Sequence, residues 1–173
     1  MKKNWYAVYT KSHCEVKVAA LLTKKKIENY CPLNRIVTNQ GTKKKMVYET
    51  LFPSFVFVYA FYTEMQMILQ TGSVVNFVYW LGNPVVIKEA EIENIKHFTN
   101  QCYNIKLEKT IVTGNNVRII SDPQIDTNIS IISVKDSTYR TLLPSLGYTM
   151  IAEIEKSTVD ILDYTFGRNK MVS

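Results

Sequence analysis

The 173-residue sequence has only six glycines, five prolines, three cysteines and two histidines. The glycines lie far apart, which excludes a Walker-type phosphate loop, and neither a G-x-S-x-G nor a C-x-x-C motif is present. An odd number of widely spaced cysteines does not indicate a disulfide framework. Two scattered histidines do not predict a zinc site. We therefore expect no catalytic residues, no metal and no cofactor.

Long apolar segments are also missing. No stretch approaches the roughly 20 apolar residues that a membrane-spanning helix needs. The chain begins with two lysines, as a signal peptide does, but Lys11, Ser12 and His13 interrupt any apolar region that could follow. Hydrophobic residues make up 46% and charged residues 21%, which is typical of a folded globular protein. These features predict a cytoplasmic protein that makes no membrane contact, and we expect it to be a monomer.

Charge and aromatic residues are unevenly distributed. Residues 1–100 contain 13 Lys and Arg against 7 Asp and Glu, whereas residues 101–173 contain 8 of each, so the whole net charge of +6 lies in the first part. The same part holds 15 of the 20 aromatic residues. The asymmetry indicates two domains with different roles, and the basic half is a candidate for binding a polyanion such as nucleic acid. A solvated lysine-rich surface would produce the same pattern.

Local patterns in the first hundred residues predict an α+β sandwich, with helices packed on a mainly antiparallel sheet. Ser12 and Glu15 have the spacing of a capping box and predict the start of a helix that runs to about residue 25. The expected strands cover residues 5–9, 29–33, 46–50, 51–59 and 74–80, and further helices are expected at 63–72 and up to residue 98.

Two features of this part suggest binding surfaces. In the strand at 51–59, Phe55 and Phe57 share one face while Val56 and Val58 share the other, so both faces must be covered, either by the chain's own helices or by a partner. The first helix presents a basic stripe that includes His13, Lys17 and Lys24 beside its apolar face. A lysine run in the expected hairpin tip at residues 38–45 could touch a phosphate backbone or be simply solvated.

The second half predicts a small β-barrel. Short strands are expected at residues 116–120, 129–134, 138–143 and 148–155, separated by turn signals. The expected organisation is a first domain at 1–100, a linker at 101–112, a barrel at 113–163 and a mobile tail at 164–173.

Several segments of the chain resemble the NusG family of transcription factors. The residues from Trp5 to Thr10 are similar to the first strand of the family's N-terminal domain, and the helix with Glu15, Val18 and Leu22 follows as it does there. The segment 51–58 is similar to the family motif F-P-G-Y-[VIL]-F, and residues 75–84 resemble the next signature. The resemblance extends over residues 4–98 and implies a NusG-type α/β sandwich followed by a KOW-like (SH3-like) barrel.

The second half departs from the family pattern. Residues 114–119 are similar to the opening strand of the KOW barrel and residues 146–154 to its closing strand, but residues 122–128 replace the expected glycine-rich loop. This departure argues against the family partners Rho and ribosomal protein S10. It indicates a specialised paralogue, similar to RfaH or to capsule-locus regulators, which act as antiterminators on particular operons.

The resemblance implies a function and a set of contact residues. Such a factor docks on the β′ clamp helices of RNA polymerase and suppresses pausing or termination, without catalysis. The positions that match the family's apolar docking surface are Tyr9, Phe52, Phe55 and Phe57. The positions that match the region near the non-template DNA strand are Lys11, His13, Lys17, Lys24 and Thr71. A plain RNA- or single-stranded-DNA-binding module, with no polymerase docking, is the alternative.

Overall fold

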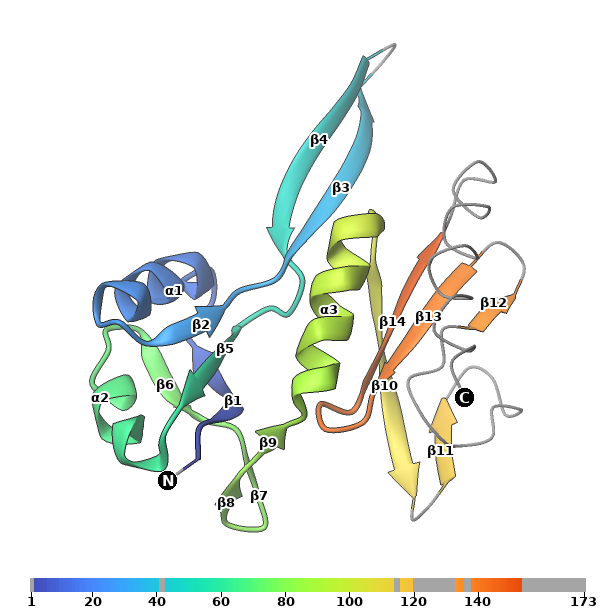
Figure 1. The fold of residues 1–173 in the computed structure, drawn as a ribbon. Helices are drawn as coiled ribbons and strands as arrows, with labels where there is room; N and C mark the ends of the chain where they lie inside the picture. The colour runs from blue at the N-terminus through green and yellow to red at the C-terminus, as the bar shows by residue number, and fades with distance from the viewer. Residues whose placement is uncertain (1, 41–42, 114–115, 120–132, 136–137, 154–173) are drawn as a thin grey trace, which may run out of the picture.

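The computed structural model describes residues 2–40, 43–113, 116–119, 133–135 and 138–153. Its N-terminal part is built on an antiparallel sheet in the order β2-β5-β1-β6, with β9 also paired to β1 (Figure 1). The strands are β1 (Asn4–Thr10), β2 (Glu28–Tyr30), β5 (Phe55–Ala60), β6 (Val74–Phe77) and β9 (Val86–Ile87). The prediction of helices on an antiparallel sheet is confirmed for this part.

Strand β5 is central, and its alternating side chains enter two different cores. Val56 and Val58 pack with Val18 of α1 (Glu15–Lys24) and Ile68 of α2 (Met65–Leu69), which follows the short 3₁₀-helix η1 (Tyr62–Glu64). Phe57 lies in the other core, with residues of α3 (Glu89–Gln101). The apolar character of both faces of this strand is therefore explained by helices of its own chain.

A second antiparallel sheet follows in the order β11-β10-β14-β13-β12. Its strands are β10 (Lys106–Thr113), β11 (Asn116–Ile119), β12 (Ser133–Lys135), β13 (Thr138–Leu143) and β14 (Tyr148–Glu153). Three expected strands have counterparts in β11, β13 and β14, and the expected strand at 129–134 overlaps β12 at residues 133–134. Residues 129–132, the loop at 122–128 and the tail at 164–173 lie outside the described residues. Closure of this sheet into a barrel stays a prediction.

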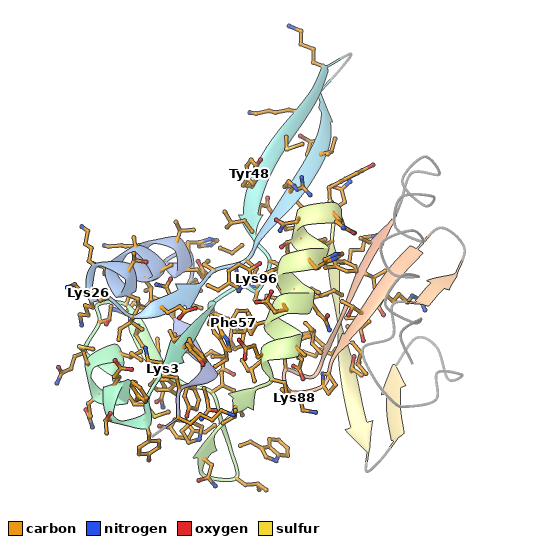
Figure 2. All side chains as sticks on the ribbon, viewed as in Figure 1. Lys3, Lys26, Tyr48, Phe57, Lys88 and Lys96 are labelled. Carbon is orange, nitrogen blue, oxygen red and sulfur yellow. The ribbon has the colours of Figure 1, made fainter. Side chains whose placement is uncertain are left out.

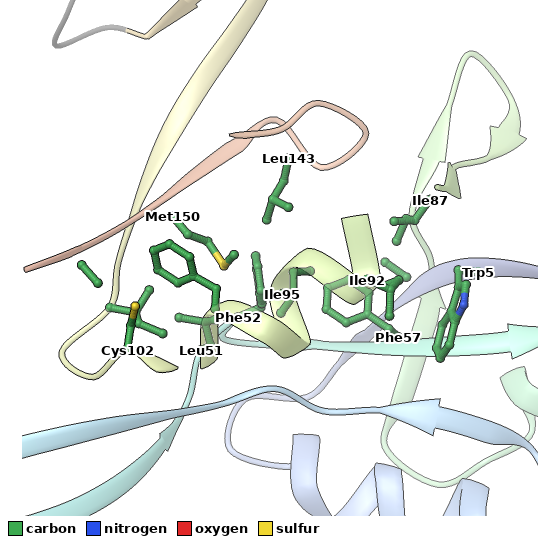
Figure 3. Packing of buried hydrophobic residues seen from close by; sticks show 14 residues of the cluster. Trp5, Leu51, Phe52, Phe57, Ile87, Ile92, Ile95, Cys102, Leu143 and Met150 are labelled. Carbon is green, nitrogen blue, oxygen red and sulfur yellow. The ribbon is translucent and has the colours of Figure 1, made fainter. Parts of the chain in front are cut away.

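Helix α3 lies between the two sheets (Figure 1). Ile92 and Ile95 belong to one continuous cluster that contains Phe57 of the first sheet and Leu143 and Met150 of the second (Figure 3). Each of these five side chains is fully buried. The hydrophobic effect, at about 25 cal/mol for each Å² of buried apolar surface, thus joins the two halves through this helix.

Strand β10 lies in the segment for which the sequence suggested a linker. It pairs with β14 from Lys106 to Lys109 and with β11 from Thr110 to Thr113. A strand was not predicted here because residues 106–112 mix charged and apolar side chains without strict alternation. The strand exists because both of its edges find partners that are distant in sequence, which a local pattern does not reveal.

Two hairpins extend from the first sheet. The larger consists of β3 (Leu33–Gln40) and β4 (Lys43–Thr50), and it projects from the body of the protein (Figure 1). The smaller consists of β7 (Tyr79–Trp80) and β8 (Asn83–Pro84).

The expected capping box at the start of α1 is wrong. The N-cap residue is Cys14, which makes no side-chain capping hydrogen bond, and His13 has a left-handed backbone with φ of 60°. The Glu15 carboxylate instead accepts a hydrogen bond from a distant backbone amide. A tertiary hydrogen bond of Glu15 has thus replaced the expected capping hydrogen bond within the helix.

Candidate functional site

An exposed aromatic pair lies at one end of the N-terminal sheet. Tyr9 of β1 and Phe55 of β5 are directly paired in the antiparallel ladder, and their ring centroids are 4.6 Å apart. Tyr9 is 41% exposed and Phe55 is half-buried. Cross-strand aromatic pairs stabilise a sheet, and here the pair also offers an apolar surface to solvent.

The other two aromatic residues predicted for docking, Phe52 and Phe57, lie in the core. Their rings are 5.4 Å apart in an edge-to-face arrangement, and only 3% of Phe52 and none of Phe57 is exposed. The second sheet covers Phe52, whose ring centroid is 6.1 Å from that of Tyr148. Phe52, Phe55 and Phe57 belong to one apolar cluster, but in this arrangement only Tyr9 and Phe55 reach the surface.

A short strained loop positions this pair. Ser54 directly precedes Phe55 and has φ of 64°, a conformation in which a Cβ atom is unfavourable. Its amide donates to the Glu15 carboxylate at 2.6 Å, and its carbonyl accepts from the amide of Thr10 at 2.9 Å. Glu15 is only 3% exposed, so this hydrogen bond is shielded from water. The loop before Phe55 is thus tied to the residue after Tyr9.

The predicted basic residues of the first helix are solvent-exposed. Lys17 and Lys24 lie on α1, and Lys11 and His13 precede it in the connection from β1. His13 lies before the first helical residue, so the expected continuous stripe from His13 along the helix is wrong. What the structure retains is a set of separate exposed basic side chains around α1.

Thr71 is a correction to the expected nucleic-acid surface. It is 3% exposed, and its hydroxyl accepts a hydrogen bond from the Lys25 ammonium at 2.9 Å and donates to the carbonyl of Met67 at 3.2 Å. A side chain buried and bonded in this way does not contact a strand of nucleic acid directly. The sequence pattern did not reveal Lys25 as its partner, because the two residues are 46 positions apart.

The cysteine side chains are the next candidates for reactive groups among the described residues. Cys14, Cys31 and Cys102 are free, and burial raises the pKa of the Cys31 and Cys102 thiols to about 11. These two thiols are therefore protonated at neutral pH and are poor nucleophiles and metal ligands. Within the described residues, no group of three or more His, Cys, Asp and Glu side chains could hold a metal ion. The helices in this part of the chain are also too short or too polar to cross a membrane.

Comparison with known proteins defines the class. Residues 3–96, more than half of the chain, match the family model described as transcription termination factor NusG. No curated protein matches the sequence. Among solved structures, one titled "Domain interaction in Thermotoga maritima NusG" is similar over 90% of this chain and 99% of that chain, with 24% sequence identity and a TM-score of 0.44.

This chain belongs to the NusG family. The matched residues include the N-terminal sheet and most of α3. Factors of this family act in transcription and are not enzymes.

Proposed function

We propose that this NusG-family protein is an elongation or antitermination factor that binds the β′ clamp helices of RNA polymerase. The observation that carries the proposal is the exposed pair of Tyr9 and Phe55 at the end of the sheet. Aromatic anchors commonly supply most of the binding energy of an interface. The factor suppresses pausing or termination on specific operons, for example a polysaccharide locus, as the specialised paralogues do.

The rigidity of the pair supports this role. A surface that is ordered before binding loses less conformational entropy in the complex. The hydrogen bond from the Ser54 amide to the buried Glu15 carboxylate holds the loop before Phe55, and the strand ladder holds Tyr9 beside it. Phe52 and Phe57 support Phe55 from within the core.

The basic residues around α1 complete the proposal. Lys11, His13, Lys17 and Lys24 are exposed and available to the phosphates of the non-template DNA strand. Lysine contacts to phosphate are salt-dependent and independent of sequence. Selection of a particular operon therefore requires further contacts to bases.

Capture of core RNA polymerase tests the docking surface. Phe55→Ala and Tyr9→Ala should each weaken capture by about 1–3 kcal/mol, because each removes an aromatic ring of the surface pair. Tyr62→Ala is the matched control, since Tyr62 is a 69% exposed aromatic residue elsewhere on the domain. Thermal melting of every variant establishes that its fold is intact. Equal capture by the wild type and both folded test variants would exclude this surface.

Phe57→Ala is a poor test of docking. It would remove a fully buried ring between the sheet and α3, at a cost of about 3–5 kcal/mol of stability. A loss of capture in that variant would therefore report on folding.

A stand-alone RNA- or single-stranded-DNA-binding module is the second candidate, and the exposed lysines around α1 favour it. It predicts affinity for naked strands comparable to that of dedicated binding proteins, with no capture of polymerase. This alternative would be supported if the wild-type protein binds naked RNA or single-stranded DNA but does not capture core polymerase.

A further inference from the structure

The small β7–β8 hairpin ends in an exposed apolar turn. Trp80 and Asn83 form its last residue pair, so Leu81 and Gly82 are the two residues of the turn. Leu81 is 86% exposed and Trp80 is 73% exposed. These are the two most exposed large apolar side chains in the part of the chain that the structure describes, and they are adjacent at the tip of one hairpin.

The backbone of the turn does not favour a leucine. Leu81 has φ of 48° and Gly82 has φ of 79°, and positive φ at both central residues is the pattern of a type I′ turn. Asparagine, aspartate or glycine is preferred at the first of these positions, whereas a leucine side chain is unfavourable there. Leu81 therefore serves neither the turn nor the core. Strained residues of this kind are concentrated at binding sites.

The segment around this turn carries no charge. Residues 65–87 contain no Asp, Glu, Lys, Arg or His, although charged residues make up 21% of the chain. A nucleic acid requires cationic side chains for its phosphates, so it does not fit this surface. An apolar surface of a protein does fit, because charged residues are depleted at the centres of protein interfaces. The large exposed apolar side chains of the hairpin and of β9 are Tyr79, Trp80, Leu81 and Val86.

Area and charge favour a second copy of the chain as the partner. At their exposed fractions these four side chains present about 500 Å² of surface, and exposed apolar patches of that size often mark interaction sites. Two copies in contact here would bury at most about 1,000 Å², which is the lower limit of a specific interface. The net charge of +6 opposes contact between two copies elsewhere, but not at a segment without charge. An apolar patch also complements itself, as the symmetric contact of a homodimer requires.

We propose that the tip of the β7–β8 hairpin is the contact between two copies of this chain in a weak, concentration-dependent dimer. The monomer expected from the sequence is then the state at low concentration. The hairpin leaves the sheet after Val78, whose amide donates to the carbonyl of Ala7, and β9 returns to pair with Trp5 and Tyr6. Tyr9 lies nearer the other end of β1, so the dimer leaves the proposed docking pair free. The dimer needs no polymerase, so it is tested separately from the proposed docking function.

Sedimentation equilibrium of the full chain at about 5–500 μM tests this contact, because an interface of this size should dissociate in the range of about 10–500 μM. Leu81→Asn should weaken the dimer at least about thirtyfold, since each dimer contains the change twice. Asn-Gly is the preferred pair in a type I′ turn, so this variant should melt no earlier than the wild type. Loss of the dimer in this variant would then not result from misfolding.

Tryptophan fluorescence gives an independent measurement of the same contact. The chain has two tryptophans, and Trp5 is only 5% exposed, so the environment of Trp80 dominates any change in emission. An indole ring emits at shorter wavelength in apolar surroundings than in water. The wild-type emission should therefore shift to shorter wavelength as the protein concentration rises, and that of Leu81→Asn should not shift over the same range.

Tyr48→Gln is the matched control. Tyr48 is 60% exposed, and Figure 2 shows it on the β3–β4 hairpin, on the opposite side of the body from β7 and β8. This variant should dimerise within about twofold of the wild type, because it lies outside the contact. A wild type that stays monomeric throughout the range, or equal dissociation constants for the wild type and Leu81→Asn, would overturn the proposal. A shift in emission caused by phosphatidylcholine vesicles, in a protein that stays monomeric, would also overturn it and assign the tip to a lipid surface.

Discussion

At the scale of single residues, Ser54 combines local strain with a role in positioning the aromatic pair. Its φ of 64° is a conformation that glycine adopts freely and residues with a side chain do not. The corresponding position in the family motif, F-P-G-Y, is a glycine. In this protein, the hydrogen bond to Glu15 and the one from Thr10 hold the strained conformation. Both involve only the backbone of Ser54, so they do not depend on its side chain.

Ser54→Gly should therefore stabilise the protein by about 0.5–1 kcal/mol, because relief of the strain exceeds the larger entropy of glycine in the unfolded chain. Urea unfolding measures the change. Ser54→Ala keeps the Cβ atom and should show no such gain. If Ser54→Gly is no more stable than Ser54→Ala, the strain at this position is smaller than its φ suggests.

At the scale of elements, side-chain hydrogen bonds join the base of the β3–β4 hairpin to residues 99–105, and we call this set the hairpin clasp. The clasp decides where the hairpin points. The sequence predicts a hairpin tip at residues 38–45, but in the structure the two strands stay paired as far as Gln40 and Lys43, and residues 41–42 lie outside the described residues. The direction of the hairpin is set by Asn34, Arg35 and Asn104. Nothing in the local pattern around residue 34 indicates this, since the partners lie about 70 residues further along the chain. A short polar residue in a strand is usually read as solvent-facing.

Asn34→Ala should destabilise the protein by about 1–3 kcal/mol, because it leaves the buried amide and carbonyl of Ile105 without partners. Chemical unfolding with tryptophan fluorescence measures this. Thr38→Ala, at an exposed position of the same strand, is the control and should change stability by less than about 0.5 kcal/mol. Equal stability of the two variants would show that water replaces the clasp.

At the scale of the whole molecule, α3 joins the two halves through one core. Besides its apolar contacts, it holds the connection between β13 and β14 by a polar contact. The Glu91 carboxylate accepts from the Ser145 hydroxyl at 2.8 Å and from its amide at 3.2 Å. Burial raises the pKa of Glu91 above its ordinary value of 4.5, although these hydrogen bonds oppose the shift. The ionised carboxylate is therefore less favourable in the folded protein than in the unfolded chain.

This shift gives a pH prediction. A raised pKa means that the folded protein binds the proton more tightly, so the stability from this group is fully present below pH 4.5. It is lost as the pH rises from 4.5 through the raised pKa. Glu91→Gln keeps an acceptor for Ser145 and should abolish this loss. Denaturant unfolding at a series of pH values checks it, with Glu93→Gln as the exposed control on the same helix. A wild-type profile parallel to that of Glu91→Gln would contradict the prediction.

The sequence by itself determined the main strands and helices of the N-terminal part and its class, but not β3 (Leu33–Gln40), which it left as a connection and a hairpin tip. The strands around Tyr9 and Phe57 and the apolar sides of α1 and α3 are local patterns, and a local pattern reflects which face must be buried. The match over residues 3–96 agrees with the family resemblance seen in those segments. The apolar faces of the strand at 51–59 were visible in the sequence, but the sequence left open whether a helix or a partner covers them.

Only the tertiary structure decided which of those aromatic residues are accessible and which are core. Phe52 and Phe57 are buried because α3 and Tyr148 lie over them, and Thr71 is buried beneath Lys25. The role of Glu15 was also decided by the tertiary structure. Its carboxylate accepts a hydrogen bond from a loop 39 residues away and does not cap its own helix. Burial and hydrogen-bond partners are properties of segments brought together from far apart in the chain. A pattern of neighbouring residues shows the chemistry of each side chain, but it does not show which distant residues pack against that side chain.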